Sequence, residues 1–191
     1  MRAKLSFLFC LAAAAGLLGA CGGADNYYRL NAIEAAPTGA SSGVSVGVGP
    51  VVLPAYIDRP EVVFESGPNE FQIPPNALWI GTLQENISRA LAADLGAILH
   101  SRNVREAGAG DFKPQYRIAL DIRRFHGISG REAVLDLSWK IEDGNTRQIL
   151  ARRSETFREP IKGDGYAAVV AAQSRLLEQC ARAMAASWPG R

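Results

Sequence analysis

YRIALDIR at residues 116–123 and AVLDLSWKIE at residues 133–142 decide the fold of this chain. In both stretches apolar side chains alternate with polar ones, a period of two that is typical of strands with one face in a core. The glycines of Gly127–Gly130 predict a hairpin between the two strands, and Asp143-Gly144-Asn145 predicts a turn into a third strand at about Arg147–Phe157. We therefore expect an antiparallel meander of three strands.

Further strands are expected upstream of this meander. The β-branched run Val44–Leu53 predicts a mostly buried strand, with Gly47, Gly49 and Pro50 marking a bend or bulge. Two short strands, Glu61–Phe64 and Glu70–Ile73, are expected on either side of a turn at Ser66–Asn69. A small strand is also expected at Tyr27–Leu30.

Two long amphipathic helices complete the predicted fold. The first follows Pro74-Pro75, with Asn76 as its N-cap, and the second covers Gly165–Trp188 after Asp164. Their apolar stripes recur every three or four residues. The stripes contain Ile80, Leu83, Ile87, Leu91, Leu95 and Ile98 in the first helix, and Val169, Val170, Leu176, Leu177, Cys180, Met184 and Trp188 in the second.

The order of these elements predicts how they connect. The first helix is expected to cross between the Val44 strand and the Tyr116 strand, and a right-handed crossover would make that pair parallel. The expected fold class is therefore α/β (or α+β), with a mixed β-sheet of about five to seven strands covered by two long amphipathic helices.

The N-terminus predicts lipidation. Arg2 and Lys4 precede the apolar run Leu5–Leu18, which has the length of a signal-peptide core and falls short of the ~20 residues that span a bilayer. A short spanning helix is the alternative. Leu18-Gly19-Ala20-Cys21 resembles a lipobox, in which small residues admit the peptidase and the Cys21 thiol carries the lipid. Residue 22 is Gly and not Asp, a sorting pattern that favours the outer membrane.

These features predict three parts of the chain. Residues 1–20 form a lipoprotein signal peptide, residues 21–43 hold the lipidated cysteine and a tether or linker, and residues 44–191 form a single domain. Cleavage would remove Arg2 and Lys4, which account for the formal net charge of +2. The balanced mature chain offers no long-range field for nucleic acid, so no nucleic-acid partner is expected. Cys180 is expected to be a small buried hydrophobe.

No reaction centre is recognisable in the sequence. His100 and His126 have no metal-spaced neighbours, and we expect both to be exposed and solvated. Ser129 lies in Gly-Ile-Ser-Gly, which does not match the nucleophile elbow G-x-S-x-G. We therefore assign no catalytic residue, no metal site and no cofactor.

The loop between residues 53 and 60 is the candidate for partner contact. Its prolines would stiffen it and lower the entropy lost on binding, and tyrosine is enriched at interfaces. The alternative is a loop tucked onto its own core. The candidate residues are Leu53, Pro54, Tyr56, Ile57, Asp58, Arg59 and Pro60.

Taken together, these motifs resemble one protein family. The lipobox, the Tyr27-Tyr28-Arg29-Leu30 start, Val48-Gly49-Pro50-Val51 leading into Leu53–Pro60, and Trp79 with Leu83 at the start of a long helix are similar to the PqiC-type family. These are the ABC-type transport auxiliary lipoproteins of MCE systems. One departure is visible: members often carry a basic residue and an acid around the tryptophan, where this chain has Leu78-Trp79-Ile80-Gly81.

The resemblance implies a non-catalytic subunit of a lipid transport system that maintains envelope integrity. It would be lipid-anchored to the outer membrane on the periplasmic face, would dock an MCE-domain (PqiB-like) protein, and would assemble as a homo-oligomeric ring. An alternative is an outer-membrane assembly lipoprotein that assists insertion of lipopolysaccharide or of a β-barrel. A periplasmic hydrolase is a third hypothesis, and the sequence offers no triad for it.

Overall fold

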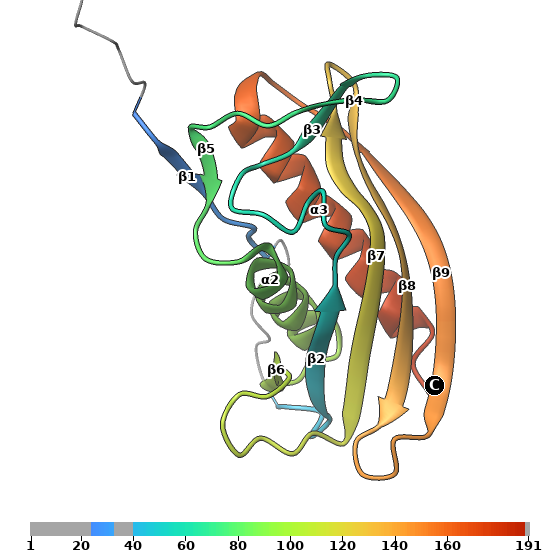
Figure 1. The fold of residues 1–191 in the computed structure, drawn as a ribbon. Coiled ribbons are helices and arrows are strands. Elements are labelled where there is room, and N and C mark those ends of the chain that lie inside the picture. The colour runs from blue at the N-terminus through green and yellow to red at the C-terminus, as the bar shows by residue number, and fades with distance from the viewer. Residues whose placement is uncertain (1–23, 33–39, 190–191) are drawn as a thin grey trace, which may run out of the picture.

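The computed structural model describes residues 24–32 and 40–189 of the chain (Figure 1). Cys21 and the predicted signal peptide lie outside the described residues. Two helices and a mixed seven-stranded sheet form the body, and a two-stranded sheet lies beside it. The predicted fold class is confirmed.

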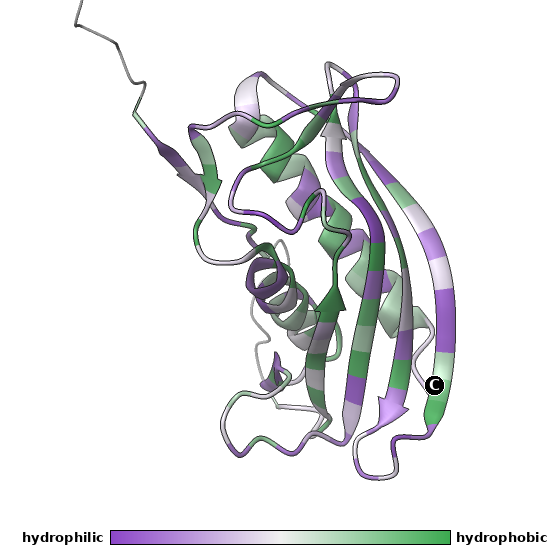
Figure 2. Cartoon of the chain, in the orientation of Figure 1, coloured by the Kyte–Doolittle hydropathy of each residue, from purple (hydrophilic) through white to green (hydrophobic). Residues whose placement is uncertain are grey.

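The antiparallel meander forms one side of the large sheet, with β7 as the central strand and β9 at the edge. Strand β7 (Tyr116–Ile128) pairs with β8 (Glu132–Asp143), which pairs with β9 (Ile149–Pro160). Figure 2 shows the alternating apolar and polar bands along β7 and β8 that the sequence predicts. Side chains of one parity enter the core because successive residues of a strand point to opposite faces.

Strands on the other side of β7 are mostly parallel to it. The first half of β7 pairs with β2 (Ser45–Val52), which pairs in parallel with β6 (Asn103–Glu106). The end of β7 pairs in parallel with β3 (Phe64–Gly67), and β3 forms a hairpin with β4 (Glu70–Gln72). The predicted parallel pairing of the Val44 and Tyr116 strands is confirmed. So is the predicted irregularity in β2, where the register with β7 shifts between Val48 and Val51.

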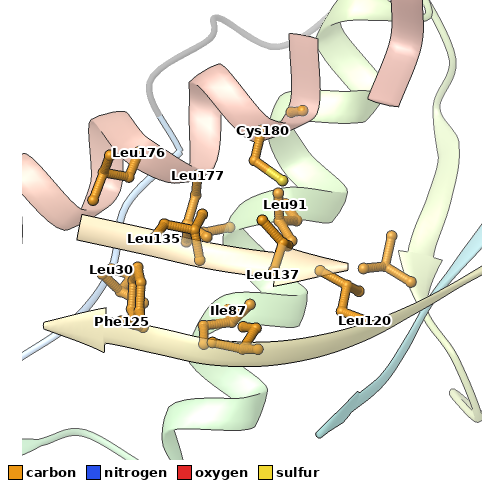
Figure 3. Close-up of a cluster of buried hydrophobic side chains, with 14 of the residues drawn as sticks. Leu30, Ile87, Leu91, Leu120, Phe125, Leu135, Leu137, Leu176, Leu177 and Cys180 are labelled. Atoms are coloured by element: carbon orange, nitrogen blue, oxygen red, sulfur yellow. The ribbon is translucent and has the colours of Figure 1, made fainter. Parts of the chain in front are cut away.

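Both helices pack against each other and against the sheet. Helix α2 (Leu83–Ile98) lies over β2 and β6, and α3 (Gly165–Ala186) lies over the meander (Figure 1). Figure 3 shows leucines of both helices meeting those of the strands, with the buried thiol of Cys180 among them. Side chains that are fully buried in this core include Leu30, Ile87, Leu91, Phe125, Leu135, Leu137, Leu176 and Leu177.

A small parallel sheet joins the N-terminal segment to the domain. It pairs β1 (Asn26–Tyr28) with β5 (Ala77–Trp79). Leu30 follows β1 into the core, and its N–H donates to the Asn86 side-chain oxygen at 3.2 Å. This part of the segment 21–43 therefore packs with the domain.

Two local predictions were wrong, and one short strand was missed. Asn76 does not cap the first helix, because residues 77–79 form β5 and the helix begins at Leu83. The Thr82 hydroxyl accepts from the Glu85 N–H, and the Glu85 carboxylate accepts from the Thr82 N–H, which closes a capping box. Residues 61–63 are not a strand, since β3 begins only at Phe64. The short strand β6 was not predicted at all.

Candidate partner-binding surface

The loop Leu53–Pro60 follows β2 and turns tightly against the domain. The Pro54 carbonyl accepts from the N–H groups of Ile57 and Asp58 at 3.1 and 3.2 Å. Ile57 belongs to the core, and Leu53 and Tyr56 are half-buried against it. The structure therefore brings the apolar part of the loop onto the chain's own core, which is the alternative that the sequence left open.

A chain of hydrogen bonds fastens Tyr56 to the sheet. The Tyr56 hydroxyl lies 3.0 Å from Nδ1 of His126, and Nε2 of His126 lies 3.2 Å from Oε2 of Glu65. Because an ionised carboxylate can only accept, the Nε2–H donates to Glu65, and Nδ1 accepts from the phenol. Loop, β7 and β3 are thereby joined through one imidazole.

Burial sets the protonation of this cluster. His126 is only 1% exposed, and this burial lowers the pKa of its imidazole. The hydrogen bond to Glu65 acts in the opposite direction and raises that pKa, but burial is the larger effect. Burial also raises the pKa of the Tyr56 phenol, partly offset by the Arg124 guanidinium. Both directions favour a neutral imidazole and a neutral phenol, the forms that the hydrogen bonds require.

Phe71 on β4 covers this cluster from outside. Its ring centroid lies 5.2 Å from that of Tyr56 and 5.2 Å from that of His126, where it meets the imidazole edge-on. Edge-to-face aromatic contacts of this kind are favourable beyond the area that they bury. Phe71 nevertheless remains 41% exposed, so the cluster presents an apolar surface to solvent.

The end of the loop turns toward solvent. Asp58 is exposed and accepts from Nε2 of Gln84 on α2 at 2.6 Å. Arg59 forms an ion pair with Glu61 at 2.9 Å, and Pro60 is exposed. The candidate surface thus consists of the loop residues Asp58, Arg59 and Pro60 and of Phe71, which packs on the half-buried Tyr56 of the same loop.

The cluster has the contacts of a structural fastening. Within the described residues, no serine, threonine or cysteine side chain is hydrogen-bonded to His126. The part of the chain that the structure describes also holds no group of three or more His, Cys, Asp or Glu residues that could bind a metal ion. The arrangement can order a loop, and it presents no activated nucleophile.

The sequence located the loop and missed what holds it. His126 was expected to be exposed, and that prediction was wrong. The register shift between Ile122 and Arg124 turns Phe125 into the core, so His126 points to the opposite face of the sheet, where Tyr56 and Phe71 cover it. Glu65 and Phe71 were not singled out, since only the β3–β4 hairpin brings them to β7. His100 is exposed and Cys180 is buried, both as predicted.

The predicted membrane anchor lies outside the described part of the chain. Cys21 precedes the described residues. Among residues 24–32 and 40–189, neither helix is apolar and long enough to cross a bilayer.

Comparisons with known proteins place the chain among lipoproteins. The model of the family described as "ABC-type transport auxiliary lipoprotein component" matches residues 28–185. No curated protein matches significantly. A crystal structure of an uncharacterized protein has a TM-score of 0.70 at 20% identity and covers 86% of this chain and 98% of its own.

Another solved protein, from Xanthomonas campestris and assigned to DUF330, has a TM-score of 0.66 at 22% identity, over 83% of this chain and 91% of its own. A PelC dodecamer from Paraburkholderia phytofirmans lies further away, with a TM-score of 0.45 at 13% identity over 83% and 96% of the two chains. At these identities the likeness of the first two shows a shared fold.

Proposed function

The chain belongs to the family of ABC-type transport auxiliary lipoprotein components, and from this premise we propose that it is a non-catalytic subunit of an MCE-type lipid transport system. It is anchored through Cys21 to the outer membrane and faces the periplasm. Its partner is an MCE-domain protein, and its role is to maintain the envelope. The observation that carries the proposal is the family match, which extends over nearly the whole described fold.

The proposed anchor rests on the sequence alone. A charged start, a short apolar run and small residues ahead of Cys21 form a lipobox pattern. One acyl chain holds a protein only marginally, and a bacterial lipoprotein carries two or three, so attachment would be stable.

The proposed docking site is the candidate surface of Asp58, Arg59, Pro60 and Phe71. An exposed aromatic ring that packs on the loop, together with the loop's charged and proline residues, has the composition of a binding patch. Its loop is already ordered by the Tyr56–His126 hydrogen bond, so little conformational entropy would be lost on binding.

Affinity capture from native membranes tests both partner and surface. We expect the full acylated chain to retain an MCE-domain protein, and we expect the double variant Asp58→Ala/Phe71→Ser to retain less of it. Ile149→Ser is the matched control, since Ile149 is 44% exposed and lies at the start of β9. Equal recovery by the double variant and the control would contradict the docking site.

The same capture separates the alternative functions. Recovery of a β-barrel protein in place of an MCE-domain protein would favour the outer-membrane assembly lipoprotein. Turnover of ester or phosphoester substrates by the purified chain would contradict the non-catalytic role. We also propose that copies assemble as a homo-oligomeric ring, for which native mass spectrometry of the detergent-solubilised protein gives the number of subunits.

A further inference from the structure

The small β1–β5 sheet carries exposed apolar side chains on its outer face, next to the Arg59–Glu61 ion pair. Its register pairs Tyr27 with Leu78, and alternation places both on the face opposite Tyr28, Ala77 and Trp79, which contribute to the core. Tyr27 is 59% exposed, and Ile80, directly after β5, is 54% exposed. These are among the most exposed large apolar side chains in the described part of the chain.

This ribbon is fixed to the domain and is not a loose arm. The Asn26 N–H donates to the Asn76 carbonyl, and the Ile80 N–H donates to the Tyr28 carbonyl, each at 2.8 Å. Nη2 of Arg89 on α2 lies 3.3 Å from the Leu30 carbonyl directly beyond the ribbon. Tyr27 and Ile80 therefore move with the body of the domain.

The ribbon also lies next to the proposed anchor in the sequence. Tyr27 comes six positions after Cys21, and six extended residues span at most about 20 Å. An acylated Cys21 sits at the membrane surface, so the ribbon would always be within that distance of the headgroups. Figure 1 shows that β1 and β5 lie together at one side of the molecule.

We infer that the outer face of the β1–β5 ribbon is a membrane-contact surface, on which Tyr27 and Ile80 enter the headgroup region of the bilayer. This inference rests on the proposed lipidation of Cys21. A tyrosine ring suits the membrane interface because one end is apolar and the other can hydrogen-bond. Arg29 is exposed two residues further along the same strand direction, and it offers a cation to acidic lipid.

The contact would give the anchor a function that acyl chains alone lack. A lipid on a short tether limits the distance between domain and bilayer and leaves the domain free to rotate. Tyr27 and Ile80 would attach the domain to the bilayer at a second site beside the tether. Two attachment sites set the orientation of the domain on the membrane. The chemistry fits a lipid surface better than a protein because the tether already supplies the high local concentration.

Fluorescence quenching tests the contact in the complete protein. Acylated Tyr27→Trp is reconstituted into vesicles of phosphatidylethanolamine and phosphatidylglycerol, with or without brominated acyl chains. Acylated Ile149→Trp is the control, because its site is also exposed and lies at the start of β9. The natural residues Trp79, Trp139 and Trp188 are buried and give the same background in each variant.

We expect the added Tyr27→Trp emission to be blue-shifted and largely lost on brominated lipid, while that of Ile149→Trp is unchanged. Mass spectrometry of each preparation reports whether Cys21 is acylated. Unquenched Tyr27→Trp in acylated protein overturns the membrane contact and leaves the proposed anchor intact. If the MCE-domain partner then shifts the Tyr27→Trp emission, the face binds a protein and not lipid. An unacylated Cys21 overturns the anchor itself, and with it the contact.

Discussion

Removal of one hydroxyl, in Tyr56→Phe, tests how the loop Leu53–Pro60 is held. The substitution keeps the ring that packs against Phe71 and His126. It removes the hydroxyl that lies 3.0 Å from Nδ1 of His126 and 3.4 Å from the Arg123 carbonyl. Nδ1 would then be a buried acceptor with no partner in the cluster.

The expected loss follows from that burial. A buried polar atom left without its hydrogen bond costs about 1–3 kcal/mol, more than the net value of an ordinary hydrogen bond. We expect the free energy of unfolding to fall by about 2 kcal/mol. For a domain of this size each kcal/mol lowers the melting temperature by about 2–4 °C, so the loss corresponds to about 4–8 °C.

Thermal and urea unfolding of the full chain in detergent measure the change. Tyr27→Phe is the matched control: its hydroxyl is on an exposed residue, and its removal should change stability by less than about 0.5 kcal/mol. If Tyr56→Phe and Tyr27→Phe have the same free energy of unfolding, the hydrogen bond from the phenol to the imidazole does not hold the loop. The docking surface would then not be ordered in advance by this bond.

The remaining predictions concern titration, capping, packing and thiols. The pKa of His126 is lowered from its ordinary 6.5, so the unfolded chain binds the proton first as the pH drops. The free energy of unfolding should therefore fall below about pH 6.5, and it should fall less in His126→Gln. Urea unfolding at several pH values measures this difference. Thr82→Ala removes the capping box of α2 and should cost about 1 kcal/mol in the same measurement, and no loss would contradict its role as N-cap. Leu91→Ala empties a fully buried site between the helices and sheet and should cost about 2–5 kcal/mol; a smaller loss in thermal unfolding would argue against this core. Burial raises the pKa of the Cys180 thiol, so it should resist alkylation in the native protein and react once urea is added, which rapid labelling in native buffer would disprove.

Much of the fold could be predicted because its long elements repeat a clear period. Tyr116–Arg123 and Ala133–Glu142 alternate over enough residues to identify both their faces and their pairing. The stripe from Leu83 to Leu95 is equally regular, so helix α2 could be recognised even though its start was misplaced. In these segments local pattern and burial agree, and no distant contact is needed to interpret them.

The start of α2 shows where local signals compete. Asn76 after two prolines is an acceptable cap, and Thr82 with Glu85 is a better one, since it satisfies two N–H groups reciprocally. The choice between them depends on β5, whose partner β1 is distant in the sequence. Three-residue strands that exist through such pairing have too short a pattern to predict alone.

The candidate site was only partly predictable for a related reason. Proline and tyrosine marked the loop, but nothing local indicates that His126 is buried or that Glu65 reaches it. Glu65 arrives because β3 pairs with the end of β7, and His126 is buried because Tyr56 of the loop and Phe71 of β4 cover its face of the sheet. Contacts of that kind join residues that are distant in the sequence, and the local alternation of β7 does not reveal them.

The mass of the N-terminal peptide of the native protein shows whether Cys21 is the lipidated first residue. We expect a chain that begins at Cys21 and carries a thioether-linked diacylglycerol with a further acyl group on its amine. A chain that still starts at Met1, with an unmodified thiol at Cys21, would contradict this expectation.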